Sequence, residues 1–265
     1  MSTSTRKIAV ITGASSGIGA VYADRFAKRG YDLVLVARRA DRLQSLAATI
    51  STTHGVSVET LVADLATDDG QASVAQVLTT NPAVSVLVNN AGIARLAPIA
   101  GGALEDSLSQ IALNITAMTR LTHAALPGMK ARNEGLIINI SSALALHSLP
   151  ISSVYSGTKA FVLSFSRGLQ QELADTAVKV QVVLPAATAT EVWDQSGVPL
   201  SALNPDTVMP TEAMVDAALT ALDQGESITL PAVADAGAIE RFESARAALF
   251  AGTQTGKVAP RLLPA

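Results

Sequence analysis

Residues Lys7 to Gly19 read KIAVITGASSGIG, and this stretch decides the fold of the chain. Its first half is an apolar run (8–11) that predicts a buried strand, and from Ile18 onward the apolar residues follow a helical period. Between them, Gly13 and Gly17 allow a tight turn and a close backbone approach to a ligand. A helix that begins at such a turn points its N-terminal N–H groups at a phosphate or pyrophosphate. The spacing G-x-x-x-G-x-G differs from the common G-x-G-x-x-G, so a generic strand-to-helix turn is the alternative reading.

Outside this stretch, short β-branched runs alternate with longer helical segments. The runs that predict strands are residues 7–12, 32–37, 56–62, 84–89, 136–141, 178–184 and 227–230. The segments with a helical period are residues 18–29, 41–53, 68–80, 104–130, 153–175 and 211–223. Because the strand runs are apolar almost throughout, helices are expected to cover both faces of the sheet. The predicted fold class is therefore α/β, with one doubly wound parallel β-sheet in three layers, α/β/α.

The composition limits the classes of function. The 265 residues include 19 Lys and Arg, 22 Asp and Glu and no Cys, so the net charge is −3. A slightly acidic chain without a basic cluster argues against nucleic acid as a partner. The lack of cysteine excludes disulfides, thiolate catalysis and Cys-based metal sites, and no metal site is expected. No stretch predicts a membrane span, and the apolar run at 8–11 is too short for a signal peptide, so a cytoplasmic protein is expected.

The length fits one domain over residues 1–265. Two segments interrupt the alternation: a loop at about 186–210, long enough to be a functional lid over a substrate, and a polar, then Pro-rich tail at 251–265. Only 15% of the residues are charged, against roughly 25% in a typical soluble protein. The predicted helix 104–130 is also apolar nearly all round, which is typical of a helix buried on both sides. We therefore expect a homo-oligomer.

Two arginines follow the second predicted strand. Arg38 and Arg39 stand where a dinucleotide site that prefers NAD carries an Asp or Glu for the ribose 2′-hydroxyl. A guanidinium at this position suits a 2′-phosphate, to which it presents a planar charged fork. The alternative is a pair of solvated arginines at a helix start. The pattern favours NADP (NADPH) over NAD as the cofactor.

A tyrosine and a lysine four residues apart lie in the predicted helix 153–175. Tyr155 and Lys159, in YSGTK, share one helical face. An isolated phenol, with a pKa near 10, is a poor acid–base group at neutral pH, but a nearby ammonium favours the phenolate and lowers that pKa. Ser142 follows the predicted strand 136–141, at the sheet edge where ligands bind in open α/β folds. Its hydroxyl is suited to donate to a substrate carbonyl as negative charge develops there.

Four motifs in this order resemble the short-chain dehydrogenase/reductase family in its compact one-domain form. They are Gly13-x-x-x-Gly17-x-Gly19, Asn89-Asn90-Ala91-Gly92, Ser142 and Tyr155-x-x-x-Lys159. The resemblance covers about residues 7–230. It implies a Rossmann-type sheet, a nicotinamide cofactor, and interconversion of a carbonyl and an alcohol without a metal. In relatives, the helices that correspond to 104–130 and 153–175 pair across a two-fold axis, so the resemblance implies a homotetramer rather than a homodimer.

The resemblance also implies roles for individual residues. Tyr155 would be the general acid–base, Ser142 would orient the carbonyl, and Lys159 would hold the nicotinamide ribose and depress the pKa of the tyrosine. Asn114 matches the fourth catalytic position, which supports a water-mediated proton path. The positions expected to bind the cofactor are Gly13, Ser15, Ser16, Gly17, Ile18, Gly19, Arg38, Arg39, Asp64, Leu65, Asn89, Ala91, Gly92, Tyr155, Lys159, Pro185, Thr188 and Thr190.

One departure from the family pattern follows the predicted strand 178–184. The usual Pro-Gly-x-x-x-Thr reads PAATAT here, so Ala186 replaces the glycine between Pro185 and Thr190. If the usual glycine has a positive φ, alanine at this position carries strain or the loop takes another course. Of the cofactor contacts that the resemblance implies, those of this loop are therefore the ones that the sequence alone determines least.

The expected function is NADP(H)-dependent interconversion of a carbonyl and an alcohol, by hydride transfer with a tyrosine as general acid–base. The loop 190–210 contains no Lys or Arg, so a small neutral or hydrophobic carbonyl or hydroxy compound is the expected substrate. Candidate substrate contacts are Ser142, His147, Tyr155 and Trp193, with a structural role as the alternative for the His and the Trp. The alternatives within the family are a hydroxy-acid dehydrogenase and a 3-oxoacyl reductase. The alternative of a different class is a catalytically silent NADP-binding sensor.

Overall fold

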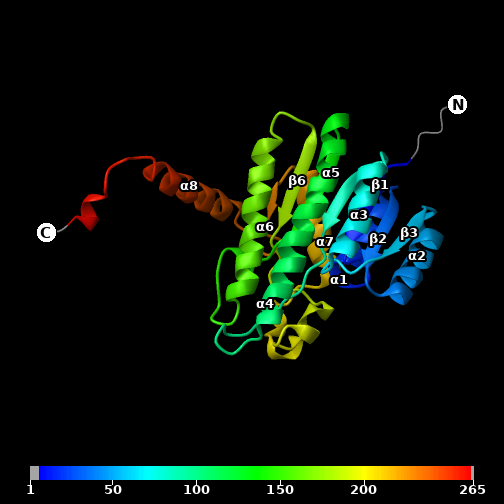
Figure 1. Ribbon diagram of the computed structural model, residues 1–265, viewed down its shortest axis with the longest axis horizontal. Helices are drawn as coiled ribbons and strands as arrows, with labels where there is room; N and C mark the ends of the chain where they lie inside the picture. Colours follow the sequence, from blue (N-terminus) through cyan, green and yellow to red (C-terminus); the bar gives the residue numbers. More distant parts are fainter. Residues whose placement is uncertain (1–5, 264–265) are drawn as a thin grey trace. The chain divides into compact units, whose positions relative to one another are not determined.

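The computed structural model describes residues 6–263, and the chain divides into two compact units, one ending at Pro231 and the other beginning at Ala232. The first unit contains a seven-stranded sheet with the order β3-β2-β1-β4-β5-β6-β7 (Figure 1). All of its paired strands are parallel. The strands are β1 (Ile8–Thr12), β2 (Asp32–Ala37), β3 (Val58–Val62), β4 (Val84–Asn89), β5 (Gly135–Ile140), β6 (Val178–Val183) and β7 (Ile228–Thr229).

Helices cover both faces of this sheet. The core on one face is shared with α1 (Gly17–Lys28), α2 (Ala40–His54) and α7 (Thr211–Asp223). The core on the other face is shared with α3 (Asp68–Thr80), α5 (Met118–Arg132) and α6 (Ser153–Glu172). This arrangement confirms the predicted Rossmann-type, doubly wound sheet in three α/β/α layers.

Neighbouring residues along a strand belong to opposite cores. On β1, Ala9 and Ile11 belong to the core that includes Phe26 of α1, whereas Val10 belongs to the core that includes Leu121 of α5. Successive side chains of a strand point to opposite faces of the sheet, and here both faces are buried. This is why the strands are apolar at nearly every position instead of alternating with polar residues.

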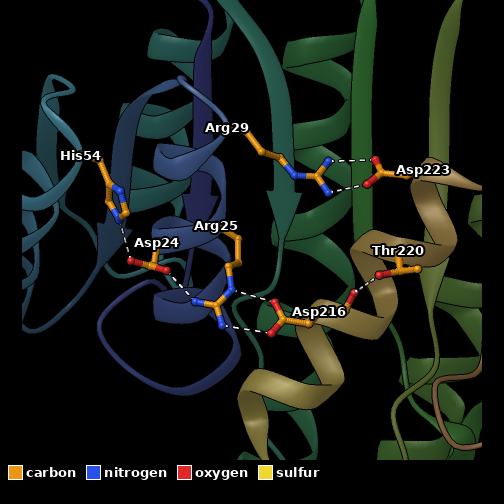
Figure 2. Close-up of polar contacts among 7 residues, drawn as sticks. All are labelled: Asp24, Arg25, Arg29, His54, Asp216, Thr220 and Asp223. Atoms are coloured by element: carbon orange, nitrogen blue, oxygen red, sulfur yellow. Dashed lines mark hydrogen bonds and ion pairs between the residues drawn. The ribbon is translucent and has the colours of Figure 1, made fainter.

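Ion pairs fasten α1 to α2 and α7 (Figure 2). Arg25 donates hydrogen bonds of 2.7 and 3.1 Å to the two carboxylate oxygens of Asp216 on α7, and one of 2.6 Å to Asp24. Asp24 also shares a hydrogen bond of 2.8 Å with His54, the last residue of α2. Arg29, at the C-terminal end of α1, forms a second bidentate pair with Asp223 of α7. The network fixes the direction of α1, the helix that starts at the glycine-rich turn.

The strand order reverses between β1 and β4, which lie side by side at the centre of the sheet. In open α/β sheets, the crevice at such a switch point, beyond the carboxyl ends of the strands, is where ligands bind. Thr12, at the end of β1, ties the two sides together. Its hydroxyl donates to the carbonyl of Val88 at 3.1 Å and accepts from the N–H groups of Asn90 and Ala91 at 3.0 Å each.

The predicted helix 104–130 is observed as α4 (Leu104–Ile111), a π-helical segment η1 (Ala112–Ala117) and α5. The apolar period predicted one regular helix, and the widened turn in its middle was missed. Single π-helical turns inside α-helices often lie at functional sites. Asn114, a predicted catalytic residue, lies in this segment.

The second unit contains the helix α8 (Ala236–Gly252) and a short 3₁₀ turn, η6 (Pro260–Leu262). The sequence analysis expected only a tail at 251–265 and missed the helix. Its apolar residues do not gather on one face, so periodicity gave no signal, although Ala, Glu and Arg are strong helix formers. The expectation of one domain over residues 1–265 stays a prediction. Among the helices that the structure describes, none combines the length and the apolar character needed to cross a lipid bilayer.

Candidate active site

The glycine-rich turn between β1 and α1 has the geometry of a ligand cradle. Gly13 has a φ of +66°, and a Cβ at this position would lie 2.8 Å from the side chain of Asn90. A Cβ on Gly19 would lie 2.4 Å from the carbonyl oxygen of Gly13. Only glycine fits these two positions, because the first needs its backbone conformation and both need its small size. The turn therefore leaves backbone N–H groups at the start of α1 close to any ligand that enters.

A pocket of about 620 Å³ lies next to this turn, a volume typical of small-molecule and cofactor sites. It is formed by the turns that follow β1 to β6, by α6 and by the loop 186–210. The predicted residues that line it are Gly13, Ser15, Ser16, Ile18, Arg38, Arg39, Asp64, Leu65, Ala91, Gly92, Ser142, Tyr155, Lys159, Pro185, Thr188, Thr190 and Trp193. The predicted residues outside the lining are Gly17, Gly19, Asn89, Asn114 and His147.

Asn89, expected to bind the cofactor, is buried in the sheet and does not reach the pocket. Its Nδ2 donates to Asn139 at 2.9 Å and to Thr122 at 3.1 Å, so it joins β4 to β5 and α5. Its neighbour Asn90 takes the place in the lining, where its Nδ2 donates to the carbonyl of Thr12 at 2.9 Å. The motif contains both asparagines, and only the course of the backbone at the end of β4 decides which one faces the pocket.

His147, expected as a substrate contact, is exposed and lies outside the pocket lining, so this expectation is corrected. Its backbone carbonyl accepts a hydrogen bond of 3.4 Å from the hydroxyl of Ser156. The segment after β5 begins with a 3₁₀ turn, η2 (Ala143–Ala145), and brings Leu144 and Leu149 to the pocket instead. The sequence position between Ser142 and Tyr155 therefore did not by itself determine which side chains point inward.

Ser142 and Tyr155 form a hydrogen-bonded pair in the lining. The hydroxyl of Ser142 accepts from the N–H of Leu144 at 3.1 Å, which leaves its own hydrogen for the phenol oxygen of Tyr155. Burial raises the pKa of Tyr155 to about 12, and the hydrogen bond with Ser142 acts in the opposite direction because it favours the phenolate. Tyr155 is therefore protonated at neutral pH, the state in which a phenol can donate a proton.

Lys159 is buried one helical turn from Tyr155. Its ammonium donates to the carbonyl of Ile140 at 2.9 Å and lies 5.7 Å from the centroid of the Tyr155 ring. Burial lowers the pKa of Lys159 to about 8. Burial is the largest influence on the pKa of Tyr155, and the expectation that this ammonium depresses that pKa stays a prediction.

Two amide side chains form paired hydrogen bonds with the backbone of the segment that follows β4. Asn114 accepts from the N–H of Ile93 and donates to the carbonyl of Ile93, both at 2.9 Å. Gln110, one helical turn earlier, accepts from the N–H of Arg95 at 3.0 Å and donates to its carbonyl at 3.3 Å. Asn114 also donates to the hydroxyl of Thr158 on α6 at 3.1 Å. Sequence reasoning missed Gln110, whose signal was a polar residue on the buried stripe of an otherwise apolar helix.

The arginines after β2 have different surroundings. Arg38 is exposed at the pocket. Arg39 donates to the two serine hydroxyls of the glycine-rich turn, at 3.0 and 2.7 Å, and to a carboxylate oxygen of Glu191 at 2.7 Å. Arg42 donates to the other oxygen of Glu191 at 2.5 Å. Arg42 was missed, although its position three residues after Arg39, at the start of a predicted helix, was an available signal.

The loop 186–210 contains three short 3₁₀ turns, η3 (Glu191–Gln195), η4 (Leu200–Ala202) and η5 (Pro205–Thr207). The indole N–H of Trp193 donates to the carbonyl of Thr188 at 2.8 Å. Arg95, from the opposite side of the pocket, donates to the carbonyl of Gln195 at 2.5 Å. The first of these contacts lies within the loop, and the second fastens the loop to the segment that follows β4, so the loop forms one wall of the pocket.

The family model described as "short chain dehydrogenase" matches residues 7–198. The match includes the glycine-rich turn and the group formed by Ser142, Tyr155 and Lys159. This chain belongs to the short-chain dehydrogenase/reductase family. Its curated relatives are named as reductases and dehydrogenases.

Solved structures of other short-chain dehydrogenases resemble it over nearly its whole length. A short-chain dehydrogenase from Sphingobium yanoikuyae in complex with NADPH is 41% identical, with a TM-score of 0.92, covering 96% of this chain and 99% of that one. The "bulky-bulky ketone specific alcohol dehydrogenase" from Comamonas testosteroni is 35% identical, with a TM-score of 0.88, covering 97% of this chain and 99% of that one. These two proteins show that the family fold extends well beyond residue 198.

Two curated relatives align with about 70% of the chain. The human 17-beta-hydroxysteroid dehydrogenase type 3 is 40% identical over 184 residues, and the Very-long-chain 3-oxoacyl-CoA reductase-A from Danio rerio is 37% identical over 190 residues. These alignments cover 69% and 70% of this chain. The chain spans about three fifths of the length of these relatives, 59% in each case.

The pocket of this short-chain dehydrogenase fits a nicotinamide dinucleotide. The cradle at Gly13 and Gly19, which a Cβ would fill, leaves room for a pyrophosphate at the start of α1. Arg38 stands at the mouth of the same pocket, and Tyr155 and Lys159 stand in its lining beneath the loop 186–210. When bound there, such a cofactor supplies or accepts the hydride.

The departure of this short-chain dehydrogenase from its family at Ala186 causes no backbone strain. Among the residues 6–263, Asn133 is the one non-glycine residue with a positive φ. Ala186 therefore takes an ordinary backbone conformation, and Thr190 still reaches the pocket. The loop accommodates alanine because its course does not need the left-handed region.

Proposed function

We propose that this short-chain dehydrogenase interconverts a ketone or aldehyde and its alcohol with NADP(H), and that Tyr155 is the general acid–base. The observation that carries the proposal is the Ser142–Tyr155 hydrogen bond beside the buried Lys159, in a pocket whose geometry fits a nicotinamide cofactor. In the direction of reduction, the protonated phenol donates its proton to the substrate oxygen. In the direction of oxidation, the phenolate accepts the proton of the alcohol.

The neighbouring groups support that step in distinct ways. Ser142 carries a hydroxyl hydrogen into the pocket and orients the carbonyl oxygen, on which negative charge develops. Lys159 holds a ribose hydroxyl and resupplies the proton, and its pKa of about 8 lies close to neutral pH, which suits a proton carrier. Asn114 positions the segment that follows β4 against α6, the helix that carries Lys159, and its proposed role is to support a water-mediated proton path.

The preference for NADP(H) rests on the charges after β2. Arg38 and Arg39 line the pocket after β2, and Arg42 pairs with Glu191 of its lining. Strand β2 ends at Ala37 without a carboxylate for a ribose 2′-hydroxyl. A 2′-phosphate gains charge-assisted hydrogen bonds from such guanidinium groups. The similar protein from Sphingobium yanoikuyae, in complex with NADPH, agrees with this preference.

The proposed substrate is a neutral, hydrophobic carbonyl or hydroxy compound. The substrate side of the pocket is lined by apolar side chains, Leu144, Leu149, Val192, Trp193 and Leu203. The guanidinium of Arg95 in this wall is already paired with the side chains of Asp106 and Gln195, so it does not favour an anionic substrate. The alternatives are a 3-oxoacyl reductase, for which the likeness to 3-oxoacyl-CoA reductases speaks, and a hydroxy-acid dehydrogenase.

The proposal includes self-association as a homotetramer. Leu104, Leu108 and Ile111 of α4 and Phe161 of α6 are exposed apolar side chains on neighbouring helices. Light scattering at micromolar concentration tests this part separately, and a monomer there contradicts it.

The function is tested by following cofactor oxidation with ketones, aldehydes, quinones, 3-oxo esters and oxo acids, each with NADPH and with NADH. The expected result is turnover of a hydrophobic ketone or aldehyde with NADPH. Tyr155→Phe is expected to keep the affinity for NADPH and to lose turnover. Retained activity in that variant refutes the proposed acid–base, and a protein that binds NADPH without turning over any substrate supports the sensor alternative.

A further inference from the structure

Glu191 brings the loop 186–210 into contact with the arginines after β2. One of its carboxylate oxygens accepts from Arg39 at 2.7 Å, and the other accepts from Arg42 at 2.5 Å. Arg39 is the N-cap residue of α2 and Arg42 lies in the first turn of that helix, whereas Glu191 begins η3. A single carboxylate thus joins the adenosine side of the pocket to the loop that covers the substrate side.

The pairing engages both oxygens of Glu191 and most of the N–H groups of Arg39. Both oxygens of Glu191 are engaged, each by a different guanidinium, and these two hydrogen bonds lower the pKa of its carboxyl to about 2. The Nε and Nη2 groups of Arg39 donate to the two serine hydroxyls of the glycine-rich turn. Arg39 therefore has no free edge for a further anion as long as Glu191 remains in place.

The chemistry of this pairing is that of phosphate recognition. A carboxylate and a phosphate present the same paired oxygens to the planar fork of an arginine, and both form charge-assisted hydrogen bonds with it. Arg38, the third guanidinium, is exposed at the pocket mouth, and the structure shows no hydrogen bond from it to any residue among 6–263. A phosphate that approaches Arg38 meets Arg39 and Arg42 with the carboxylate of Glu191 already bound to them.

We propose that Glu191 is a specificity-determining residue that couples recognition of the 2′-phosphate to the position of the substrate loop. The 2′-phosphate competes with the carboxylate for Arg39 and Arg42, and its binding releases the start of η3. A cofactor without this phosphate leaves the carboxylate on the arginines and the loop in its present position. The inference rests on the proposed preference for NADP(H).

The contacts at the other end of η3 confine the movement. Arg95 donates to the carbonyl of Gln195 at 2.5 Å, and the N–H of Leu96 donates to the carbonyl of Ser196 at 2.6 Å. When Glu191 is released, residues 191–194 therefore move, whereas Gln195 and Ser196 stay in place. Trp193, which lines the pocket, lies within this stretch and is the one tryptophan of the chain.

The test uses two probes that differ only in the phosphate and carry no nicotinamide, adenosine 2′,5′-bisphosphate and 5′-AMP. Fluorescence of Trp193 reports the position of the loop, and calorimetry reports affinity. In the unaltered protein, the bisphosphate is expected to change the emission of Trp193 and 5′-AMP is not. In Glu191→Gln, the emission of Trp193 is expected to differ before any probe is added and to stay constant when a probe binds. The bisphosphate is expected to bind this variant about three- to ten-fold more tightly, because two competing exposed ion pairs have been removed.

Asp194→Asn is the matched control, because it removes one negative charge from the same turn at an exposed residue that the structure does not pair with either arginine. It is expected to respond as the unaltered protein does. Equal affinity for the two probes refutes the NADP(H) preference and this coupling with it. Tighter binding of the bisphosphate without a change in the emission of Trp193, or with the same change in Glu191→Gln, refutes the coupling and leaves the preference standing.

Discussion

Asn114 holds Ile93 by both of its backbone groups, since its side chain accepts from the N–H and donates to the carbonyl, each at 2.9 Å. Asparagine is a poor residue for a helix interior, because its side chain competes for backbone hydrogen bonds. Here it satisfies backbone groups of another segment from within the π-helical turn η1, and its remaining hydrogen bond reaches α6. One side chain thereby ties together the wall of the pocket and the helix that carries Tyr155.

We expect Asn114→Ala to lower both stability and turnover. The N–H and carbonyl of Ile93 lose their partner, which costs about 1–3 kcal/mol in the free energy of unfolding. Gln110→Ala is the matched comparison, because it removes the equivalent pair of hydrogen bonds to the backbone of Arg95, one helical turn away from Asn114. Urea denaturation is expected to show similar losses for both variants, whereas kcat falls strongly only for Asn114→Ala. Equal effects on kcat contradict a specific role for Asn114.

We expect Ser142→Ala to move the pH profile of alcohol oxidation to higher pH. The hydrogen bond with Ser142 favours the phenolate, so its removal raises the pKa of Tyr155 further, and oxidation depends on the phenolate. Loss of the carbonyl-orienting donor also lowers kcat by about 10²–10³-fold. The pH–rate profile of kcat/KM measures the shift.

The neighbouring hydroxyl provides the control for this experiment. Ser141 is buried, and its hydroxyl donates to the carbonyl of Lys159 at 2.7 Å and not to Tyr155. Ser141→Ala is expected to reduce stability and leave the midpoint of the pH profile where it is. A profile that moves equally in both variants assigns the effect to general loosening of the site.

We expect the buried Lys159 to make stability depend on pH. Its pKa in the folded protein is about 8, below the ordinary value of 10.5, so the ammonium is penalised in the folded state. This penalty is present below pH 8 and disappears as the pH rises toward 10.5. The free energy of unfolding of the unaltered protein, relative to Lys159→Met, is therefore expected to rise by about 2–3 kcal/mol between pH 7 and pH 10.

Chemical denaturation at a series of pH values measures this difference, in which the tyrosines common to both proteins cancel. Lys28→Met, which removes an exposed lysine of α1, is the control and is expected to show no such rise. Parallel curves for the unaltered protein and Lys159→Met exclude a desolvated ammonium.

We expect Arg38→Leu to weaken NADPH binding by about 10- to 100-fold, the usual worth of a hydrogen bond to a charged group. The affinity for NADH is expected to change little, because NADH lacks the 2′-phosphate. Arg29→Gln, on α1 and bonded to Asp223, removes the same charge away from the pocket and serves as the control. Equal losses for both cofactors contradict recognition of the phosphate by Arg38.

The features that the sequence determined are those encoded by neighbouring residues. The strand and turn at 7–19 predicted the cradle, because only glycine satisfies its backbone at Gly13 and its close approach at Gly19. The spacing of Tyr155 and Lys159 placed both on one helical face, and continuous apolar strands predicted a sheet covered on both sides. In each case the deciding residues lie close together in the sequence, so the local backbone conformation or the period of the element is sufficient.

Only the tertiary structure decided the contacts between segments that lie far apart in the chain. Glu191 meets Arg39 across about 150 residues, Gln110 grips Arg95, and His147 turns outward although it lies between two residues of the site. The same holds for the pKa of Tyr155, which burial raises although the sequence places a lysine beside it. Periodicity fixes which face of an element is buried, but the direction of a loop side chain and the desolvation of a charge depend on what the rest of the chain packs around them.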